Sequence, residues 1–266
     1  MGVINVTPDS FSDGGAALEP AKALDIALAM AASGADLIDV GAESTRPGAT
    51  AVGTADEIAR VLPVLRALAS KVGIPISIDT YKADVAAQAL DAGAAIVNDI
   101  SGLQYDPSLG GVVARRGVPV ILMHTRGRPS DMSAHADYGD VVAEVSSDLQ
   151  RCIDRALECG IARDRILVDP GLGFAKRAEH SFTALAGIDR LAELGFPLVV
   201  GPSRKSFMTS ATGPLGTEDR DWPTAAAVTA AVLGGAHVVR VHRVAEMVLV
   251  VRVADAIRNA HVATNL

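Results

Sequence analysis

The stretch GVINVTPDSFSDGG, residues 2–15, is a short apolar run, Gly2–Asn5, that leads directly into a polar loop ending in two glycines. The apolar run is typical of a buried strand. The loop carries two carboxylates and three hydroxyls, more reactive groups than a simple connection needs. Seven further apolar runs in the chain also end in reactive side chains. This recurrence predicts a functional site built where buried strands end.

The other apolar runs are continuous rather than alternating, as expected of parallel strands that are buried on both faces. The predicted strands are Gly2–Asn5, Leu37–Val40, Pro75–Asp79, Ala95–Asp99, Pro119–Met123, Ile166–Asp169, Pro197–Gly201 and His237–Val241. Stretches with helical periodicity lie between them. The clearest are Pro20–Ser33, Ala55–Ser70, Asp140–Cys159 and Val244–Ala260.

Eight alternations of strand and helix predict an α/β fold, a (β/α)8 TIM barrel that forms a single domain over residues 1–266. The alternative is a doubly wound open sheet. That fold normally has fewer strands and places a glycine-rich dinucleotide-binding turn after the first strand. Here residues 5–9, Asn-Val-Thr-Pro-Asp, follow the first strand instead, which favours the barrel.

Composition excludes several classes of protein. No apolar stretch reaches the roughly 18 residues that span a bilayer, and no charged-then-apolar leader precedes the first strand, so we expect a soluble cytoplasmic protein. The net charge of −7 without a basic block argues against nucleic acid. Cys152 and Cys159 lie too far apart along one helix for a disulfide, and we expect packed, reduced thiols. No metal-binding spacing of His or Cys is present.

Active sites of this barrel form at the carboxyl ends of the strands. There the sequence places, in order, Asn5, Glu43–Arg46, Asp79, Asn98–Asp99, Met123–His124, Asp169, Ser203–Lys205 and Arg240–His242. Asp and Asn also cap helices, which is the plain alternative for any one of these positions. Polar residues at all eight strand ends are harder to explain by capping alone.

Two groups of these residues suit particular ligands. A carboxylate accepts two parallel N–H bonds from an amino-pyrimidinone edge, so Asp79, Asn98 and Asp169 together suit a fused nitrogen heterocycle. The loops after strands seven and eight usually hold phosphate in this fold, which points to Lys205 and Arg240. The alternatives are a simple turn at Pro170–Gly173 and a solvated basic edge at Arg204 or Arg243.

The chain resembles the dihydropteroate synthase family in a series of signatures that run in order through almost its whole length. They are Asn5–Gly15, Glu43–Gly48, Ser77–Thr80, Val97–Asp99, Leu122–His124, Asp169–Phe174, Ser203–Ser206 and Arg240–His242. The resemblance implies that 6-hydroxymethyl-7,8-dihydropterin diphosphate condenses with 4-aminobenzoate to give 7,8-dihydropteroate and pyrophosphate in folate biosynthesis. It also implies a dissociative displacement, a Mg²⁺ cofactor, a homodimer and sensitivity to sulfonamides.

The resemblance assigns a role to each matching residue. The catalytic residues would be Asp13, Arg46, Asp79, Lys205, Arg240 and His242. The pterin would contact Thr45, Asp79, Asn98, Met123, Asp169, Phe174, Lys205 and Arg240. The 4-aminobenzoate pocket would use Phe11, Ser12, Thr45, Pro47, Phe174 and Ser206. Pyrophosphate would bind Asn5, Arg46, Arg240 and His242, with Asn5 also facing the metal.

The chain departs from the family pattern at two positions near the phosphate site. Arg243 replaces the aspartate that commonly follows the Arg-Val-His triplet, and Pro202 replaces a small residue before Ser-Arg-Lys. Two other functions therefore stay open. A pterin-dependent methyltransferase shares the pterin-reading residues but has no use for a pyrophosphate site. A pterin-binding paralogue without synthase activity is the second alternative.

Overall fold

Eight short parallel strands alternate with helices in the computed structural model, which describes residues 1–7, 19–216 and 219–264. The strands begin and end within two residues of the apolar runs that predict them. They are β1 (Gly2–Asn5), β2 (Ile38–Gly41), β3 (Ile76–Asp79), β4 (Ile96–Asp99), β5 (Val120–Met123), β6 (Ile166–Asp169), β7 (Val199–Val200) and β8 (Val238–Val239).

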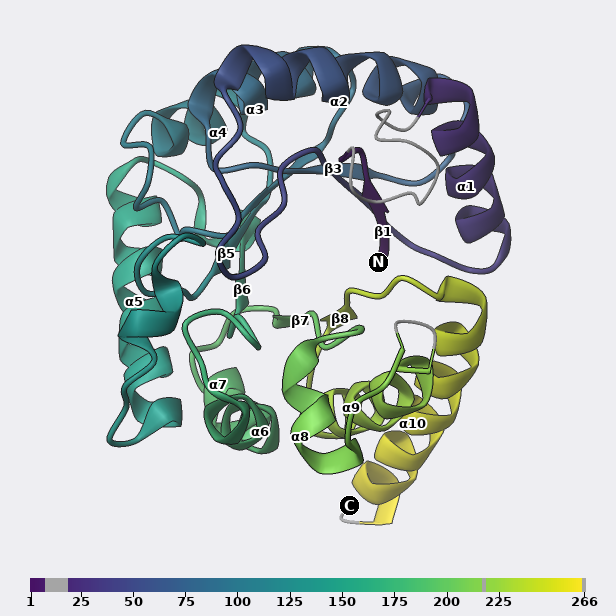
Figure 1. The fold of residues 1–266 in the computed structure, drawn as a ribbon, viewed down its shortest axis with the longest axis vertical. Coiled ribbons are helices and arrows are strands. Elements are labelled where there is room, and N and C mark those ends of the chain that lie inside the picture. The colour runs from purple at the N-terminus through teal and green to yellow at the C-terminus, as the bar shows by residue number, and fades with distance from the viewer. Residues whose placement is uncertain (8–18, 217–218, 265–266) are drawn as a thin grey trace.

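The strands close into a barrel with two different kinds of contact. Strands β1 to β6 form one continuous parallel sheet in sequence order, and β7 pairs with β8 in a second, shorter sheet. Single bridges join the two sheets, one between Val168 and Leu198 and one between Gly2 and Val241. The strands surround the centre of Figure 1, and the prediction of a (β/α)8 barrel is confirmed.

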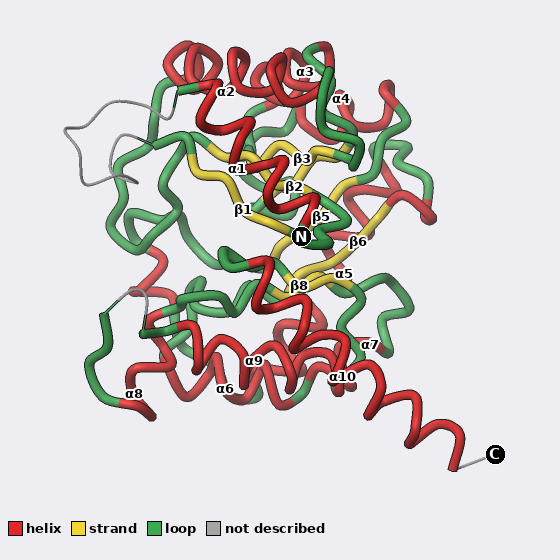
Figure 2. The backbone as a smooth tube through the Cα atoms, turned by 90° about the vertical axis from the view of Figure 1, so that its right-hand side faces the viewer, coloured by secondary structure: helices red, strands yellow, loops and turns green. Residues whose placement is uncertain are grey.

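Helices cover the outside of the strands (Figures 1 and 2). The α-helices are α1 (Pro20–Ala32), α2 (Thr54–Ala69), α3 (Ala83–Asp91), α4 (Leu109–Arg116), α5 (Val141–Glu158), α6 (Ala178–Ala186), α7 (Ile188–Ala192), α8 (Thr209–Thr212), α9 (Asp221–Leu233) and α10 (Val244–Thr264). Short 3₁₀ helices are η2 (Met132–His135), η3 (Arg163–Arg165) and η4 (Ser206–Met208).

Local sequence signals explain where several helices begin and end. The Asp140 side chain caps α5 by accepting the backbone N–H groups of Val142 and Ala143, each at 3.1 Å. Gly117 ends α4 in the left-handed conformation, with φ at 63°, which glycine adopts without the steric cost of a Cβ atom.

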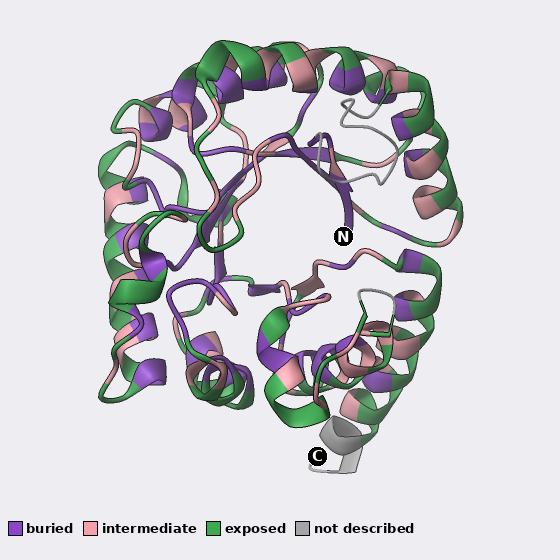
Figure 3. Cartoon of the chain, in the orientation of Figure 1, coloured by how far each residue is buried: buried purple, intermediate pink, exposed green. Residues whose placement is uncertain are grey.

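The core is aliphatic, and its buried residues line the strands and the inward faces of the helices (Figure 3). Strand β2 is buried at all four positions, including the charged side chain of Asp39. Cys152 and Cys159 are free thiols, but Cys159 is exposed, so the expectation that both thiols are packed is wrong for this residue. Within the described part of the chain, the helices are too short or too polar to cross a bilayer.

Candidate active site

The predicted site residues at the ends of β1 to β6 meet at one rim because the strands are in register. Asn5 pairs with Gly41, Gly41 with Asp79, and Asp79 with Asn98 across successive strands. Met123 pairs with Asp169 on the neighbouring pair of strands. A Cβ atom at Gly41 would lie only 3.2 Å from Cβ of Asp79, so the glycine leaves room for this carboxylate.

Arg240, just after β8, faces two carboxylates at this rim. Its Nε donates to Oδ2 of Asp39 at 2.6 Å and its Nη2 donates to Oδ2 of Asp79 at 3.0 Å. These carboxylates raise the pKa of Arg240, although burial acts in the opposite direction. Burial, followed by the charge of Asp39, raises the pKa of Asp79 to about 7. Arg240 is therefore a fixed cation at the mouth of the barrel.

Asp39 is not among the site residues predicted from the sequence, yet it bonds three side chains at the centre of the rim. Besides Arg240, it accepts the side-chain N–H of Asn98 at 3.1 Å and the hydroxyl of Ser77. The bond to Asp39 fixes the orientation of the Asn98 amide. The available signal was a carboxylate in the middle of an apolar strand, because a buried charge requires partners.

Asp169 and Phe174 are held by the loop that follows β6. Oδ1 of Asp169 accepts the backbone N–H of Gly171 at 2.7 Å, and burial raises the pKa of Asp169 to about 6. The Phe174 ring and Met123 belong to one buried apolar cluster. Nζ of Lys205 lies 4.0 Å from the centre of the Phe174 ring, a cation–π contact. Burial, followed by the charge of Arg240, lowers the pKa of Lys205 to about 8.

His242 is fixed by Ser203, another residue without an assigned role. Oγ of Ser203 lies 2.9 Å from Nδ1 of His242 and also accepts its backbone N–H at 3.2 Å. Burial, followed by the charge of Arg240, lowers the pKa of His242 to about 4. The imidazole is therefore neutral at pH 7, and it can act as a hydrogen-bond donor rather than as a cation.

Arg204 and Arg243 each form an ion pair with an acidic side chain of a nearby helix, α9 or α10. Arg204 forms a two-point ion pair with Asp221 at 2.9 and 3.1 Å, and Arg243 pairs with Glu246. Arg204 has a left-handed backbone, with φ at 59°, and its N–H donates to Thr224. Both arginines therefore match the alternative of a basic edge, whereas Lys205 faces the Phe174 ring.

The loop between β2 and α2 carries Thr45, Arg46 and Pro47. Lys82 ties this loop down by donating to Glu43 at its start and to the carbonyl of Val52 near its end. At its tip, the N–H of Gly48 donates to the carbonyl of Pro129 at 2.7 Å. Thr45 is partly buried, and Arg46 and Pro47 are exposed.

A cavity of about 400 Å³ lies between this loop and the loops after β6 and β7. Pro47, Gly173 and Ser206 line it, together with Lys176 and Phe207. Two residues predicted for the 4-aminobenzoate pocket, Pro47 and Ser206, thus border one cavity from different loops.

Three predicted site residues, Phe11, Ser12 and Asp13, lie outside the described residues. Across residues 1–7, 19–216 and 219–264, His, Cys, Asp and Glu side chains form no group of three or more suited to a metal ion.

Comparison with known proteins identifies the family of this chain. A family described as pterin binding enzymes matches residues 1–242. The dihydropteroate synthase of Synechocystis sp. is 46% identical over 257 residues, which cover 97% of this chain and 89% of the relative.

Two solved structures are similar over the same span. The Yersinia pestis dihydropteroate synthase with a sulfonamide drug has a TM-score of 0.92 and 40% identity, covering 97% of this chain and 94% of that one. The Xanthomonas albilineans dihydropteroate synthase with 4-aminobenzoic acid has a TM-score of 0.90 and 43% identity, covering 97% and 92%. The chain therefore belongs to the pterin binding enzyme family and, within it, to the dihydropteroate synthases.

Proposed function

We propose that this barrel mouth condenses 6-hydroxymethyl-7,8-dihydropterin diphosphate with 4-aminobenzoate and releases pyrophosphate. The chain is a transferase of folate biosynthesis by its family, and the assignment of roles to its residues is our proposal. One observation carries the assignment. The acids Asp79 and Asp169 lie at the same rim as the paired cation Arg240, as a heterocycle bearing a diphosphate requires.

The pterin ring would lie among the strand ends. Asp169 would accept two N–H bonds from the amino-pyrimidinone edge, and Asn98 would bond the ring beside it. Lys205 would donate to the ring carbonyl and a ring nitrogen, and Arg240 would stack on the ring. Met123 and Phe174 would form the apolar wall, with Thr45 covering the ring from the second loop.

The diphosphate would lie beside Arg240 and His242, with Arg46 reaching it from the second loop. The neutral imidazole of His242 would donate a hydrogen bond to a phosphate oxygen. We propose Mg²⁺ as cofactor, next to the side-chain oxygen of Asn5. Mg²⁺ commonly takes one or two protein oxygens plus substrate phosphates and waters, so a single amide oxygen beside the diphosphate suits it. When bound, it would neutralise charge on the leaving pyrophosphate.

The displacement would be dissociative. Cleavage of the C–O bond leaves a pterin-methyl cation, and the electron pair departs with pyrophosphate. Asp79 would stabilise the developing cation, while Arg240 would stabilise the leaving group. The neutral arylamine nitrogen of 4-aminobenzoate then attacks the methylene carbon, so the reaction needs no strong general base.

The 4-aminobenzoate would occupy a pocket at the junction of the loops. Pro47 and Ser206 support this proposal because they line the same cavity. Ser206 begins η4, and its hydroxyl and backbone N–H would bind the carboxylate. Phe174 and Thr45 would border the ring, and Phe11, Ser12 and Asp13 of the first loop would complete the pocket when the loops close.

We also propose a cytoplasmic homodimer that uses the last helices. On α10, the exposed side chains of Leu249, Val253 and Ile257 are spaced four residues apart and therefore form one apolar stripe. The exposed thiol of Cys159 suits a reducing compartment. Sedimentation of the wild-type chain and of a Val253→Glu variant would test the dimer, which the charge should dissociate.

A coupled pyrophosphate-release assay tests the reaction. Release that requires both substrates, with 7,8-dihydropteroate as product, is the expected result. A pterin-dependent methyltransferase would release no pyrophosphate. A non-catalytic paralogue would bind the pterin diphosphate without turnover, and either outcome would overturn the proposed reaction.

A further inference from the structure

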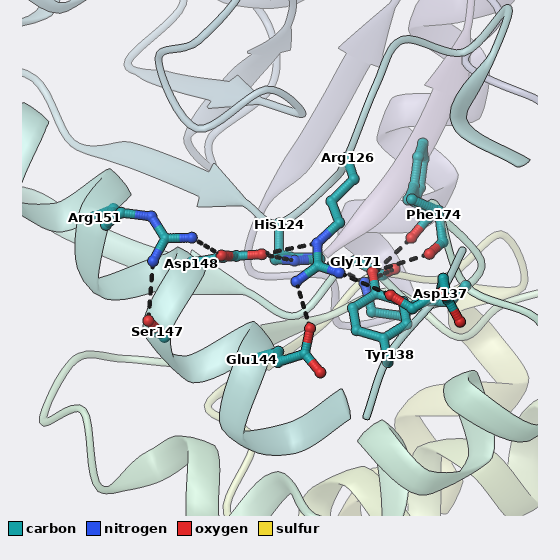
Figure 4. A network of polar contacts seen from close by, with 12 residues as sticks. His124, Arg126, Asp137, Tyr138, Glu144, Ser147, Asp148, Arg151, Gly171 and Phe174 are labelled. Carbon is teal, nitrogen blue, oxygen red and sulfur yellow. Dashed lines mark hydrogen bonds and ion pairs between the residues drawn. The ribbon is translucent and has the colours of Figure 1, made fainter. Parts of the chain in front are cut away.

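A buried cation, Lys176, lies behind the loop that follows β6. Its Nζ is 2.7 Å from Nδ1 of His124 and 3.2 Å from the carbonyl oxygens of both Gly171 and Phe174. Figure 4 labels these three partners. A lysine ammonium has three N–H groups, and three acceptors surround this one. The nitrogen thus joins the end of β5 to both ends of the short segment 171–174.

The imidazole of His124 connects this cation to a carboxylate on α5. An ammonium only donates, so Nδ1 of His124 must accept, and its proton resides on Nε2. Nε2 lies 2.9 Å from Oδ2 of Asp148, which also accepts Nε of Arg126 at 3.1 Å (Figure 4). Burial, followed by the charge of Lys176, lowers the pKa of His124 to about 4, so the ring is neutral.

The segment held by Lys176 also positions two residues assigned to the pterin. The N–H of Gly171 donates to Oδ1 of Asp169 at 2.7 Å, and the ring of Phe174 lies against Lys205. The N–H of Phe174 donates to the carbonyl of Gly171 at 3.0 Å. A shift of either carbonyl would therefore move the carboxylate or the aromatic ring.

The backbone from Gly171 to Ala175 adopts left-handed conformations that surrounding contacts must stabilise. Gly171 and Gly173 have φ values of 65° and 75°, and Ala175, which has a Cβ atom, has a φ of 46°. A non-glycine residue in this region costs roughly 1–3 kcal/mol and persists only where its surroundings hold it. The hydroxyl of Tyr138 bonds the carbonyl of Ala175 at 2.9 Å, adding a second tether beside Lys176.

We propose that Lys176, oriented through His124 by Asp148, is a positioning residue that fixes Asp169 and Phe174 for pterin binding. This inference rests on the proposed function, because that function assigns both residues to the pterin. Lys176 would not contact the reacting atoms. Its loss should therefore weaken pterin binding more than it slows turnover at saturation.

Lys176→Met removes the donors and keeps much of the side chain's length. Arg155→Met is a matched control, because Arg155, on α5, is another cation that ties a barrel loop, donating to the carbonyl of Gly102 at 3.0 Å. Burial lowers the pKa of Lys176 to about 7, so binding is best compared near pH 6.5, where the ammonium form predominates. Calorimetry with the pterin diphosphate should show about tenfold weaker binding for Lys176→Met, with kcat at saturation within about threefold. Arg155→Met should bind the pterin like the wild type.

Two more variants separate positioning from simple packing. Asp148→Asn removes the charge at nearly constant size and should weaken pterin binding by a smaller factor, about threefold, which keeps the test available if Lys176→Met fails to fold. Lys176→Ala opens space beside the cavity that Lys176 lines, and added propylammonium should restore pterin affinity. Propanol, which has no charged donor, should not.

The outcomes are separable from those of the proposed function. Wild-type pterin affinity in both Lys176→Met and Asp148→Asn would overturn the positioning role, and so would equal rescue by propanol or no rescue by either compound. Wild-type enzyme that releases no pyrophosphate would instead overturn the proposed reaction. Loss of pterin binding in Asp169→Ala beside unchanged Lys176 variants would leave the reaction standing without this inference.

Discussion

Arg240 and Asp39 lie 201 residues apart in the sequence, yet Nε of the arginine is 2.6 Å from a carboxylate oxygen of Asp39. Asp39 is fully buried, and the same guanidinium reaches Asp79 on the next strand. One side chain thus links the last strand of the barrel to the second and third. Arg240, the cation assigned to the pterin and the diphosphate, is thus held in place by Asp39, which has no assigned substrate contact.

Asp39→Ala should therefore destabilise the fold and not only the site. Removing one partner of a buried ion pair leaves the other charge uncompensated and costs about 3–5 kcal/mol. Urea denaturation measures this loss. Asp255→Ala is the control, because its exposed pair with Arg258 should contribute at most about 1 kcal/mol. Similar losses in both variants would contradict the role given to Asp39.

Pterin affinity should fall as the pH drops below about 6, where Asp169 takes up a proton. Its pKa in the folded state is raised above the unfolded value, so this group favours the fold most below about pH 4 and that contribution is lost as pH rises through 6. Binding has the opposite sign because it needs the ionised form, and affinity should drop by up to about tenfold per pH unit.

Asp169→Asn should weaken pterin binding and remove this part of the pH dependence. Asp79, whose pKa is raised to about 7, keeps its own contribution in that variant. Asp169→Ala should cost about 2–3 kcal/mol or more of pterin affinity with the fold intact. Calorimetry across pH 5–8 checks both variants, and unchanged pterin binding in either would exclude Asp169 from the site.

Gly171→Ala should be far more damaging than Gly117→Ala, although both glycines have left-handed φ values of 65° and 63°. A Cβ atom at Gly171 would lie 2.0 Å from the backbone oxygen of His124, whereas none of the described atoms lies within 4 Å at Gly117. We expect a loss of about 1–2 kcal/mol at Gly117 and about 3 kcal/mol or more at Gly171. Thermal unfolding of the two variants tests the difference.

Loop residues should affect the second substrate more than the first. The pterin would bind among the strand ends, whereas Arg46 and Asp13 would act only when the loops close. Arg46→Ala and Asp13→Ala should therefore leave pterin affinity within a few-fold, while kcat/KM for 4-aminobenzoate falls about 10²-fold, near 2.7 kcal/mol. Lys205→Ala should weaken pterin binding and also lower kcat/KM for 4-aminobenzoate. Steady-state kinetics and pterin titration separate these patterns. Near-wild-type turnover in both loop variants would contradict the proposal that the loops close over the substrates.

Sulfamethoxazole should compete with 4-aminobenzoate. Pro47 and Ser206 border one cavity, and the segment Thr45–Ala49 has no inserted residues that would exclude a sulfonamide ring. Inhibition measured at several 4-aminobenzoate concentrations should give a rising KM at constant kcat. A drug that fails to compete at concentrations similar to those of 4-aminobenzoate would contradict this pocket.

The fold was predictable because its signal is local and repeated. Continuous apolar runs located every strand, and Gly117 ends α4 with a left-handed backbone that glycine adopts easily. The brevity of β7 and β8 was not predictable, since backbone pairing depends on the geometry of both neighbours. Their apolar runs, Pro197–Gly201 and His237–Val241, look as long as the others.

The rim residues were predictable from their place at strand ends, but their partners were not. Asp39 and Ser203 act on Arg240 and His242 across distances of 201 and 39 residues, and no spacing in the sequence encodes these pairs. Arg204 and Lys205 are adjacent in the sequence, but Arg204 has a left-handed backbone and pairs with Asp221, which the sequence alone does not indicate. The roles given to the site residues stay predictions.

The rim acids and most of the cations assigned to the substrate come from different sheets of the barrel. Asp39, Asp79 and Asp169 belong to the six-stranded sheet, whereas Lys205, Arg240 and His242 follow the strands of the short one. A pterin diphosphate bound as proposed would touch both and span the junctions that single bridges make. Bound substrate would then stabilise the junctions between the two sheets. Substrate binding should slow hydrogen exchange of the backbone amides of Val168 and Val241, as well as of the residues that the substrate contacts.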